Sequence, residues 1–303
     1  MSKISETVIE RDSVGSTAQS LLKNRYEVRE LIGQGGMASV YRGIDTSLGR
    51  DVAIKMYAAS TDDIEVARQE DEVNVLASLS HHSLVTLLDA GVDRTDRTRP
   101  RVFLVMELVR GLDLQRTLLD GPLGARQIGQ IGYDLAEGLE YIHRQGIIHR
   151  DIKPANVLLA DQEVETARTR AMLTDFGIAH RGAHAQDVSA TTTGTAAYLS
   201  PEQARREEVG RESDIYSLGL VLLECFTGKL AYPGPPVDAA ISRLIDDPII
   251  PRSIGGDWRS LLSAMTSLRR EDRPEASEIV LALRDLVMAE SGRHRMADAD
   301  LVT

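Results

Sequence analysis

A glycine-rich turn near the start of the chain, Ile32-Gly-Gln-Gly-Gly-Met-Ala-Ser-Val40, has the composition of an anion-binding backbone. Glycines lack a Cβ atom, so successive N–H groups can approach an anion closely. A dinucleotide-binding turn needs a third glycine and a following helix, whereas this chain has Ala38 at that position and a strand-like segment after it. Phosphate binding and an ordinary hairpin therefore remain the two interpretations of this turn taken alone.

A lysine ends the apolar segment Val52-Ala-Ile-Lys55 that follows. A strand lysine is often a surface residue whose stem packs while its ammonium reaches water. The order favours another role, because a glycine turn followed by V-A-I-K sets phosphate-contacting backbone and a phosphate-pairing cation on neighbouring strands. We expect an acidic partner on the predicted helix 64–79 and favour Glu72 over Glu70. Solvated helix charges are the alternative for both glutamates.

The densest polar motif is His149-Arg-Asp-Ile-Lys-Pro-Ala-Asn156, and Asp175-Phe-Gly177 comes after it. Together the motifs occur in the order G-x-G, V-A-I-K, H-R-D-x-K-x-x-N and D-F-G. This order resembles the catalytic domain of eukaryotic-like (Hanks-type) bacterial serine/threonine protein kinases. The resemblance extends from about Tyr26 to about Met288, nearly the whole chain.

The resemblance implies a role for each polar residue of these motifs. Asp151 would orient the substrate hydroxyl and accept its proton, and Lys153 would contact the γ-phosphate. Asn156 and Asp175 would be the metal ligands, holding Mg²⁺, with Mn²⁺ as an alternative, against the phosphates of ATP. H-R-D-x-K-P-x-N also resembles serine/threonine kinases rather than tyrosine kinases.

The resemblance also implies a nucleotide site lined by both predicted lobes. Val40 and Ala53 would enclose the adenine, and Met106-Glu-Leu-Val109 resembles the hinge, with Met106 as gatekeeper. Backbone groups of Glu107 and Val109 would hydrogen-bond the base. The complete set of expected nucleotide-binding residues is Ile32, Gly33, Gly35, Gly36, Val40, Ala53, Lys55, Met106, Glu107, Val109, Asn156 and Asp175.

A hydroxyl-rich segment lies between Asp175 and Glu202. Arg150 is a cation beside Asp151 that a phosphate on this segment could pair with, which predicts regulation by phosphorylation. The candidate phosphosites are Ser189, Thr191, Thr192 and Thr193. Thr195 is expected to contact the catalytic residues instead.

Three further residues are expected to be structural. Ser200-Pro-Glu202 resembles the family's A-P-E anchor, with serine in place of alanine, and Glu202 would pair with a buried Arg273. Asp214 resembles the aspartate that braces the catalytic loop. An ordinary carboxylate at a helix start is the alternative for Asp214.

The elements predicted around these motifs change character along the chain. Strands are expected at 26–32, 40–44, 51–57, 84–92 and 101–108, and helices at 64–79, 128–142, 214–227, 237–245, 257–268 and 276–288. In the last helix, Ile279, Leu281 and Leu286 are available for burial. A strand-rich front and a helix-rich back indicate an α+β chain with two lobes. By resemblance this is the bilobal protein kinase fold, with a small antiparallel N-lobe (about 26–108) carrying one regulatory helix and a larger, mainly helical C-lobe (about 111–288). Residues 1–25 are expected to be a flexible leader and 289–303 a polar tail.

Composition limits the remaining classes. The formal charge of −11 argues against nucleic-acid binding, and Cys225 is the only cysteine of the 303 residues, so no internal disulfide can form. No apolar stretch long enough for a membrane segment occurs, so the expected location is cytoplasmic, as a stand-alone kinase or an excised catalytic domain. Protein substrates are the expected partners, and a transient homodimer for trans-autophosphorylation is compatible with the resemblance.

Two other functions are weighed against an active kinase. A pseudokinase acting as a nucleotide-responsive scaffold would be favoured by the loss of a catalytic group. Lys55, Asp151, Lys153, Asn156 and Asp175 are all present. A small-molecule kinase of related fold is disfavoured by the Ser-Pro-Glu202 anchor and its Arg273 partner.

Overall fold

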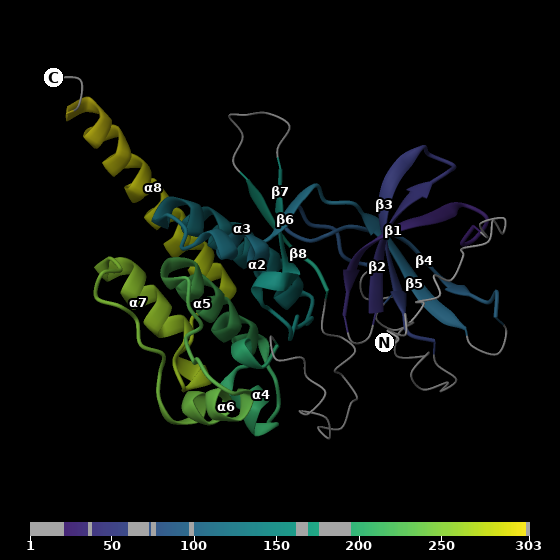
Figure 1. Ribbon diagram of the computed structural model, residues 1–303. Coiled ribbons are helices and arrows are strands. Elements are labelled where there is room, and N and C mark those ends of the chain that lie inside the picture. Colours follow the sequence, from purple (N-terminus) through teal and green to yellow (C-terminus); the bar gives the residue numbers. More distant parts are fainter. Residues whose placement is uncertain are drawn as a thin grey trace, which may run out of the picture.

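The computed structural model describes residues 21–35, 38–59, 73, 77–96, 100–161, 169–175 and 195–300. Within these ranges, the side chains of Thr195, Pro236 and 291–300 are not described. Figure 1 shows a strand-rich part and a helical part side by side. The predicted two-lobed α+β architecture is confirmed.

The smaller lobe is a five-stranded antiparallel sheet with the strand order β1-β2-β3-β5-β4. Its strands are β1 (Tyr26–Gln34), β2 (Ala38–Asp45), β3 (Arg50–Tyr57), β4 (Leu87–Asp93) and β5 (Arg101–Glu107). Alternation along β3 divides the apolar residues between two faces. Val52 and Ile54 pack in one cluster with Tyr26, and Ala53 packs in the other with Met106. The second face is therefore the one on which the expected adenine-enclosing residues lie.

The larger lobe is built around two buried helices, α3 (Ala125–Arg144) and α5 (Arg211–Thr227). The predicted apolar stripe of α3, from Ile128 to Ile142, is buried in the main core cluster. Trp258 and Cys225 are buried in the same cluster. The other helices are α2 (Leu114–Thr117), α4 (Pro201–Arg205), α6 (Pro236–Ile245), α7 (Gly256–Met265) and α8 (Ala276–Asp300), with short 3-10 turns η1 (Leu118–Asp120), η2 (Pro154–Asn156), η4 (Thr195–Tyr198) and η5 (Arg270–Asp272).

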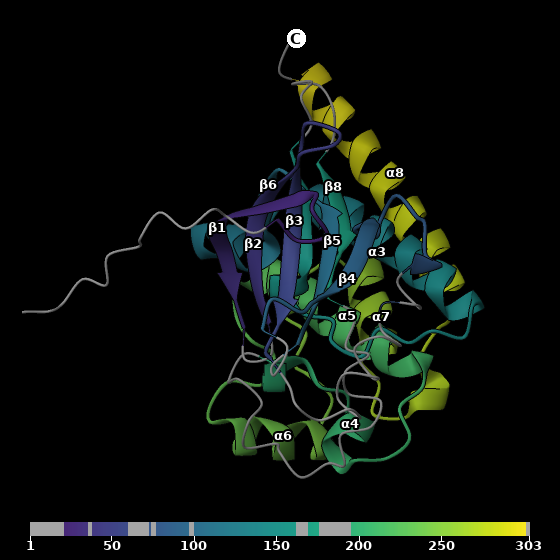
Figure 2. The ribbon, with the colours of Figure 1, turned by 90° about the vertical axis from the view of Figure 1, so that its right-hand side faces the viewer.

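A small antiparallel sheet supports the catalytic motifs between the two parts. It consists of β6 (Gly111–Asp113), β7 (Val157–Ala160) and β8 (Arg170–Leu173), in that order. β7 begins directly after Asn156 and β8 ends just before Asp175. Because these two strands are hydrogen-bonded neighbours, the two expected metal ligands are brought to the same end of the sheet. Figure 2 views the five-stranded sheet face on, with the helical part of Figure 1 behind it.

Two boundaries and the burial of one residue differ from the prediction. The described chain is already packed before Tyr26, because Leu22 is buried with Tyr26 and Lys23 forms an ion pair with Asp89. α8 continues beyond Met288 to Asp300, through residues that include good helix formers such as alanine and arginine. Leu281, one of three residues of the last predicted helix expected to be available for burial, is 52% exposed instead.

Most of the remaining predicted helix, 64–79, lies outside the described residues. Among the residues of this range that the structure describes, Val73 and Ala77 are helical. Among the described residues, no helix combines the length and apolarity needed to cross a bilayer.

Candidate active site

A buried carboxylate at the start of α5 holds the backbone of the catalytic loop. Asp214 Oδ2 accepts a hydrogen bond from the His149 amide at 2.9 Å, and Oδ1 accepts one from the Arg150 amide at 2.8 Å. The Nε2 atom of His143, near the end of α3, lies 2.8 Å from Asp214 Oδ2. Asp214 is therefore more than a helix-start carboxylate, because its two oxygens bind successive amides of a distant loop.

Two site residues adopt the left-handed backbone region that side chains usually avoid. Arg150 has φ 69° and Asp175 has φ 57°. Such conformations cost about 1–3 kcal/mol each and persist only where surrounding contacts hold them. The Asp214 hydrogen bonds supply those contacts at Arg150.

The Asp151 carboxylate is the point on which the catalytic loop converges. Lys153 Nζ lies 2.8 Å from Asp151 Oδ2. Asn156 Nδ2 donates both to the Asp151 carbonyl at 2.8 Å and to Asp151 Oδ2 at 3.0 Å. Because Nδ2 is used in both bonds, Oδ1 is the atom of this amide that can act as a metal ligand.

An ion pair joins the two lobes across the site. Lys55 Nζ, on β3, lies 3.1 Å from Asp175 Oδ1, just beyond β8. Partial desolvation opposes ionisation of Asp175, but the charge of Lys55 and its hydrogen bond outweigh that effect and hold the pKa of Asp175 below its ordinary value. Asp175 is thus an ionised carboxylate at neutral pH, as a magnesium ligand must be.

A buried histidine links the catalytic loop to the Asp175 segment. His149 Nε2 lies 3.2 Å from the Thr174 carbonyl, and the Thr174 amide donates to the Asn156 carbonyl at 3.0 Å. Burial lowers the pKa of His149 below its ordinary value, although nearby carboxylates oppose the shift. The imidazole is therefore neutral at pH 7, and its contact with Thr174 connects the catalytic loop to the segment that carries Asp175.

The described residues predicted to bind the nucleotide, apart from Asn156 and Asp175, lie on β1, β2, β3 and β5, in the turn between β1 and β2, or just after β5. The Gly35 amide donates to the Ala38 carbonyl at 2.9 Å, which closes the glycine turn between β1 and β2. Val40 and Met106 pack in the same cluster as Ala53. The residues fit Mg-ATP in kind, with apolar side chains for a base and Lys55 and Asp175 for its phosphates and metal.

One detail of the hinge narrows the expectation for the Glu107 backbone. The Glu107 amide donates to the Thr86 carbonyl at 3.0 Å, and its carboxylate accepts from the Thr86 amide at 2.7 Å. A base at this hinge would therefore have to use the Glu107 carbonyl, since the amide is already bonded.

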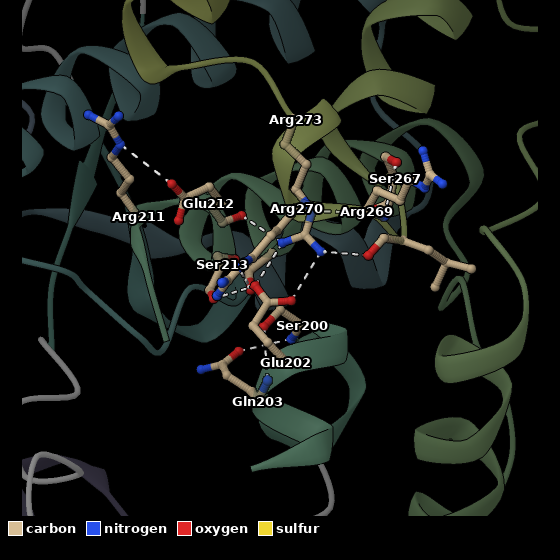
Figure 3. Close-up of polar contacts among 12 residues, drawn as sticks. Ser200, Glu202, Gln203, Arg211, Glu212, Ser213, Ser267, Arg269, Arg270 and Arg273 are labelled. Atoms are coloured by element: carbon tan, nitrogen blue, oxygen red, sulfur yellow. Dashed lines mark hydrogen bonds and ion pairs between the residues drawn. The ribbon is translucent and has the colours of Figure 1, made fainter. Parts of the chain in front are cut away.

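A buried ion pair between Glu202 and Arg273 anchors the start of α4. Both Arg273 Nη atoms contact Glu202, at 2.7 and 3.0 Å, and Figure 3 shows the two side chains facing each other. Ser213 also donates to Glu202, and Arg273 donates to the Ser267 carbonyl at 2.8 Å. These contacts outweigh the desolvation of Glu202 and leave its pKa below its ordinary value.

Serine in place of alanine in the anchor has a local explanation. Ser200 is the N-cap of α4, and its hydroxyl accepts from the Gln203 amide at 3.2 Å. Gln203 Oε1 in turn accepts from the Ser200 amide at 2.9 Å, which completes a capping box. Gln203 Nε2 then donates to the Arg150 carbonyl at 2.9 Å, so the cap also ties α4 to the catalytic loop.

Several predicted residues lie outside the description. Gly36, Glu72, Ser189, Thr191, Thr192 and Thr193 are not among the described residues, and Thr195 is described only by its backbone in η4. Sequence reasoning, for its part, missed His143 and Gln203. The sequence signals were weak: His143 is the next-to-last residue of α3, seven residues before Arg150, and Gln203 stands at the N3 position of a capping box.

Comparison with known proteins agrees with this geometry. The model of the protein kinase domain matches residues 26–282. Serine/threonine-protein kinase PknB of Mycobacterium leprae is 36% identical over 282 residues, which cover 90% of this chain and 44% of that protein. PknB of Mycolicibacterium smegmatis is 38% identical over 256 residues (82% and 40%), and a probable serine/threonine-protein kinase of Clostridium acetobutylicum is 34% identical over 264 residues (84% and 38%). The chain spans less than half the length of these relatives. With its bilobal fold and this match over most of its length, the chain belongs to the protein kinase family.

Proposed function

We propose that this chain is an active serine/threonine protein kinase that transfers the γ-phosphoryl group of ATP to protein hydroxyls. The observation that carries the proposal is the convergence of Lys153 and Asn156 on the Asp151 carboxylate, with the Lys55–Asp175 pair opposite. The names of the bacterial relatives support serine and threonine as acceptors.

Each residue has a defined part in this reaction. The Asp151 carboxylate orients the acceptor hydroxyl and takes its proton as the hydroxyl oxygen bonds to the γ-phosphorus. The bond from that phosphorus to the bridging oxygen breaks, and ADP leaves. Lys153 and Lys55 offset the charge on the phosphates, and Asn156 with Asp175 would hold Mg²⁺, which neutralises phosphate charge when bound.

We also propose that the kinase phosphorylates its own segment between Asp175 and Glu202. The support is chemical: the segment contains Ser189 and Thr191–193, and Arg150 adjoins the catalytic Asp151. A phosphate accepts strong charge-assisted hydrogen bonds from arginine, which would order the segment beside the catalytic loop.

One experiment tests both proposals. Purified protein is incubated with Mg²⁺ and ATP and analysed by intact-mass and phosphopeptide mass spectrometry, beside Asp151→Asn and the exposed control Asp285→Asn. We expect added phosphates on the wild type and the control, concentrated at 189–193, and none on Asp151→Asn, which should still bind ATP. Phosphate found only elsewhere would contradict the self-phosphorylation sites. ATP binding without transfer to itself or to a protein acceptor would point to a scaffold instead.

A further inference from the structure

A buried arginine in α6 contacts the segment that leads to the Glu202 anchor. The Arg243 side chain is fully buried, and its described polar contacts are all backbone carbonyls. Nε donates to the Ala239 carbonyl one turn earlier in α6, at 3.0 Å. Nη1 donates to the Leu199 carbonyl, and Nη2 to the Ala197 carbonyl at 3.2 Å.

The carbonyl of Tyr198, between those of Ala197 and Leu199, is bound by a residue of α5. Ser217, in α5, donates its hydroxyl to the Tyr198 carbonyl at 2.8 Å. Three successive carbonyls, from Ala197 to Leu199, are therefore bound alternately by α6 and α5. This arrangement fixes the orientation of each peptide plane in the segment, not merely its path.

Packing holds the Arg243 guanidinium in place. Its central carbon lies 5.2 Å from the centre of the Tyr232 ring, and the Tyr232 hydroxyl donates to the Asp246 carbonyl at 2.8 Å, at the end of α6. Burial of a cation whose described acceptors are neutral is costly, and burial lowers the pKa of Arg243 from its ordinary value. An apolar side chain would fill the same space at lower cost, so the hydrogen bonds to Ala197 and Leu199 are what distinguish arginine here.

The segment held by Arg243 lies next to the catalytic loop. It runs directly into Ser200 and Gln203, and Gln203 Nε2 donates to the carbonyl of Arg150, the residue before Asp151. Because Gln203 bonds the residue before Asp151, residues 197–199 lead directly to the loop that carries Asp151, and we take this surface as the one that receives the acceptor chain. The nucleotide, by contrast, is expected beside the Lys55–Asp175 ion pair, on the side of the five-stranded sheet.

We propose that Arg243 is a positioning residue for the protein substrate, acting through the carbonyls of Ala197 and Leu199. It shapes the surface that receives the acceptor chain and has no part in binding ATP. This inference rests on the proposed function, since it assigns a substrate-side role within that same reaction.

The test compares Arg243→Lys and Arg243→Met with Arg205→Met. Arg205 is the matched control because it also bonds a backbone carbonyl at the α4–α6 contact, that of Leu244, but from an exposed position. The measurements are kcat and KM for myelin basic protein as acceptor, the Kd for ATP, and ATP hydrolysis without acceptor.

For Arg243→Met we expect a rise of about tenfold or more in the acceptor KM, because small displacements of positioning groups have large kinetic effects. The Kd for ATP and the hydrolysis rate should stay at wild-type values. The acceptor KM of Arg243→Lys should lie between those of the wild type and Arg243→Met. An ammonium can donate to one of the two carbonyls but cannot span both. Arg205→Met should match the wild type.

The outcomes separate this inference from the function on which it rests. An unchanged acceptor KM in both Arg243 variants, or an equal loss of hydrolysis and transfer at constant KM, would overturn the positioning role. If Arg243→Met does not fold, the KM of Arg243→Lys decides the question. Failure of the wild type to phosphorylate any protein acceptor would overturn the proposed function, and this inference with it.

Discussion

Lys55 and Asp175 form an ion pair of 3.1 Å that connects the two lobes of the protein. Lys55 belongs to the central strand of the five-stranded sheet, and Asp175 follows the last strand of the small sheet beside the catalytic loop. Their pairing holds a cation and an ionised carboxylate together at the place where phosphates and a metal would have to meet.

Replacement of Lys55 by methionine should cripple transfer while preserving the fold. The substitution removes the cation that positions the phosphates, and preorganised charges of this kind are worth about 10²-fold or more in rate. The measurements are kcat with a protein acceptor and the melting temperature. Lys229→Met, at an exposed position, is the control. Transfer at the wild-type rate by Lys55→Met would exclude the assigned role.

Asp214→Asn should weaken both the catalytic loop and the fold. Asparagine keeps one oxygen but turns an NH₂ group toward an amide, so at least one charge-assisted hydrogen bond is lost, at a cost of about 1.5–3 kcal/mol in unfolding free energy. Turnover should fall as well, because the left-handed backbone at Arg150 loses its support.

Asp257→Asn is the matched control for this prediction, since Asp257 also lies in the first turn of a helix, α7. If both substitutions have equal effects in urea unfolding, Asp214 acts through the helix dipole alone.

Removal of Arg273 should lower the free energy of unfolding more than removal of its partner Glu202. Arg273→Met leaves the Glu202 carboxylate with a hydroxyl donor, Ser213, and should cost about 3–5 kcal/mol. Glu202→Gln should cost less, because Arg273 retains carbonyl acceptors at Ser267 and Glu212. Urea unfolding of both variants and of the double variant measures the coupling. Equal costs for the two single variants would contradict this asymmetry.

The Asp45 carboxylate in the small lobe should make the stability of the protein depend on pH in the acidic range. The hydrogen bond from Arg25 lowers the pKa of Asp45 from 3.8 to about 2. A depressed pKa in the folded state means that its stabilising contribution is complete above pH 3.8 and is lost as the pH falls toward about 2.

Asp45→Asn should therefore be less stable than the wild type at pH 5, and the difference should shrink below pH 3.8. Arg25→Gln should weaken the same pH dependence, because it removes the hydrogen bond that lowers the pKa of Asp45. Thermal unfolding across this range is the measurement, and a gap between wild type and Asp45→Asn that stays constant from pH 5 to pH 2.5 would contradict the shift.

Much of this protein follows from local sequence. The alternation in β3 and the three-to-four residue spacing in α3 determine which side chains face the core, because the geometry of a strand or helix is set by neighbouring residues. Motifs such as H-R-D-x-K-x-x-N combine the residue types of a reaction within one loop. Family and chemistry were therefore readable before any contact was known.

Tertiary structure decided how the motifs support one another. The grip of Asp214 on the amides of His149 and Arg150, and the bond from Gln203 to the catalytic loop, join residues that are far apart in the chain. The burial of Arg243 against three carbonyls has no pattern in the sequence at all. Such contacts depend on how whole helices and sheets pack, since a hydrogen bond is decided by the relative position of two elements and not by the composition of either.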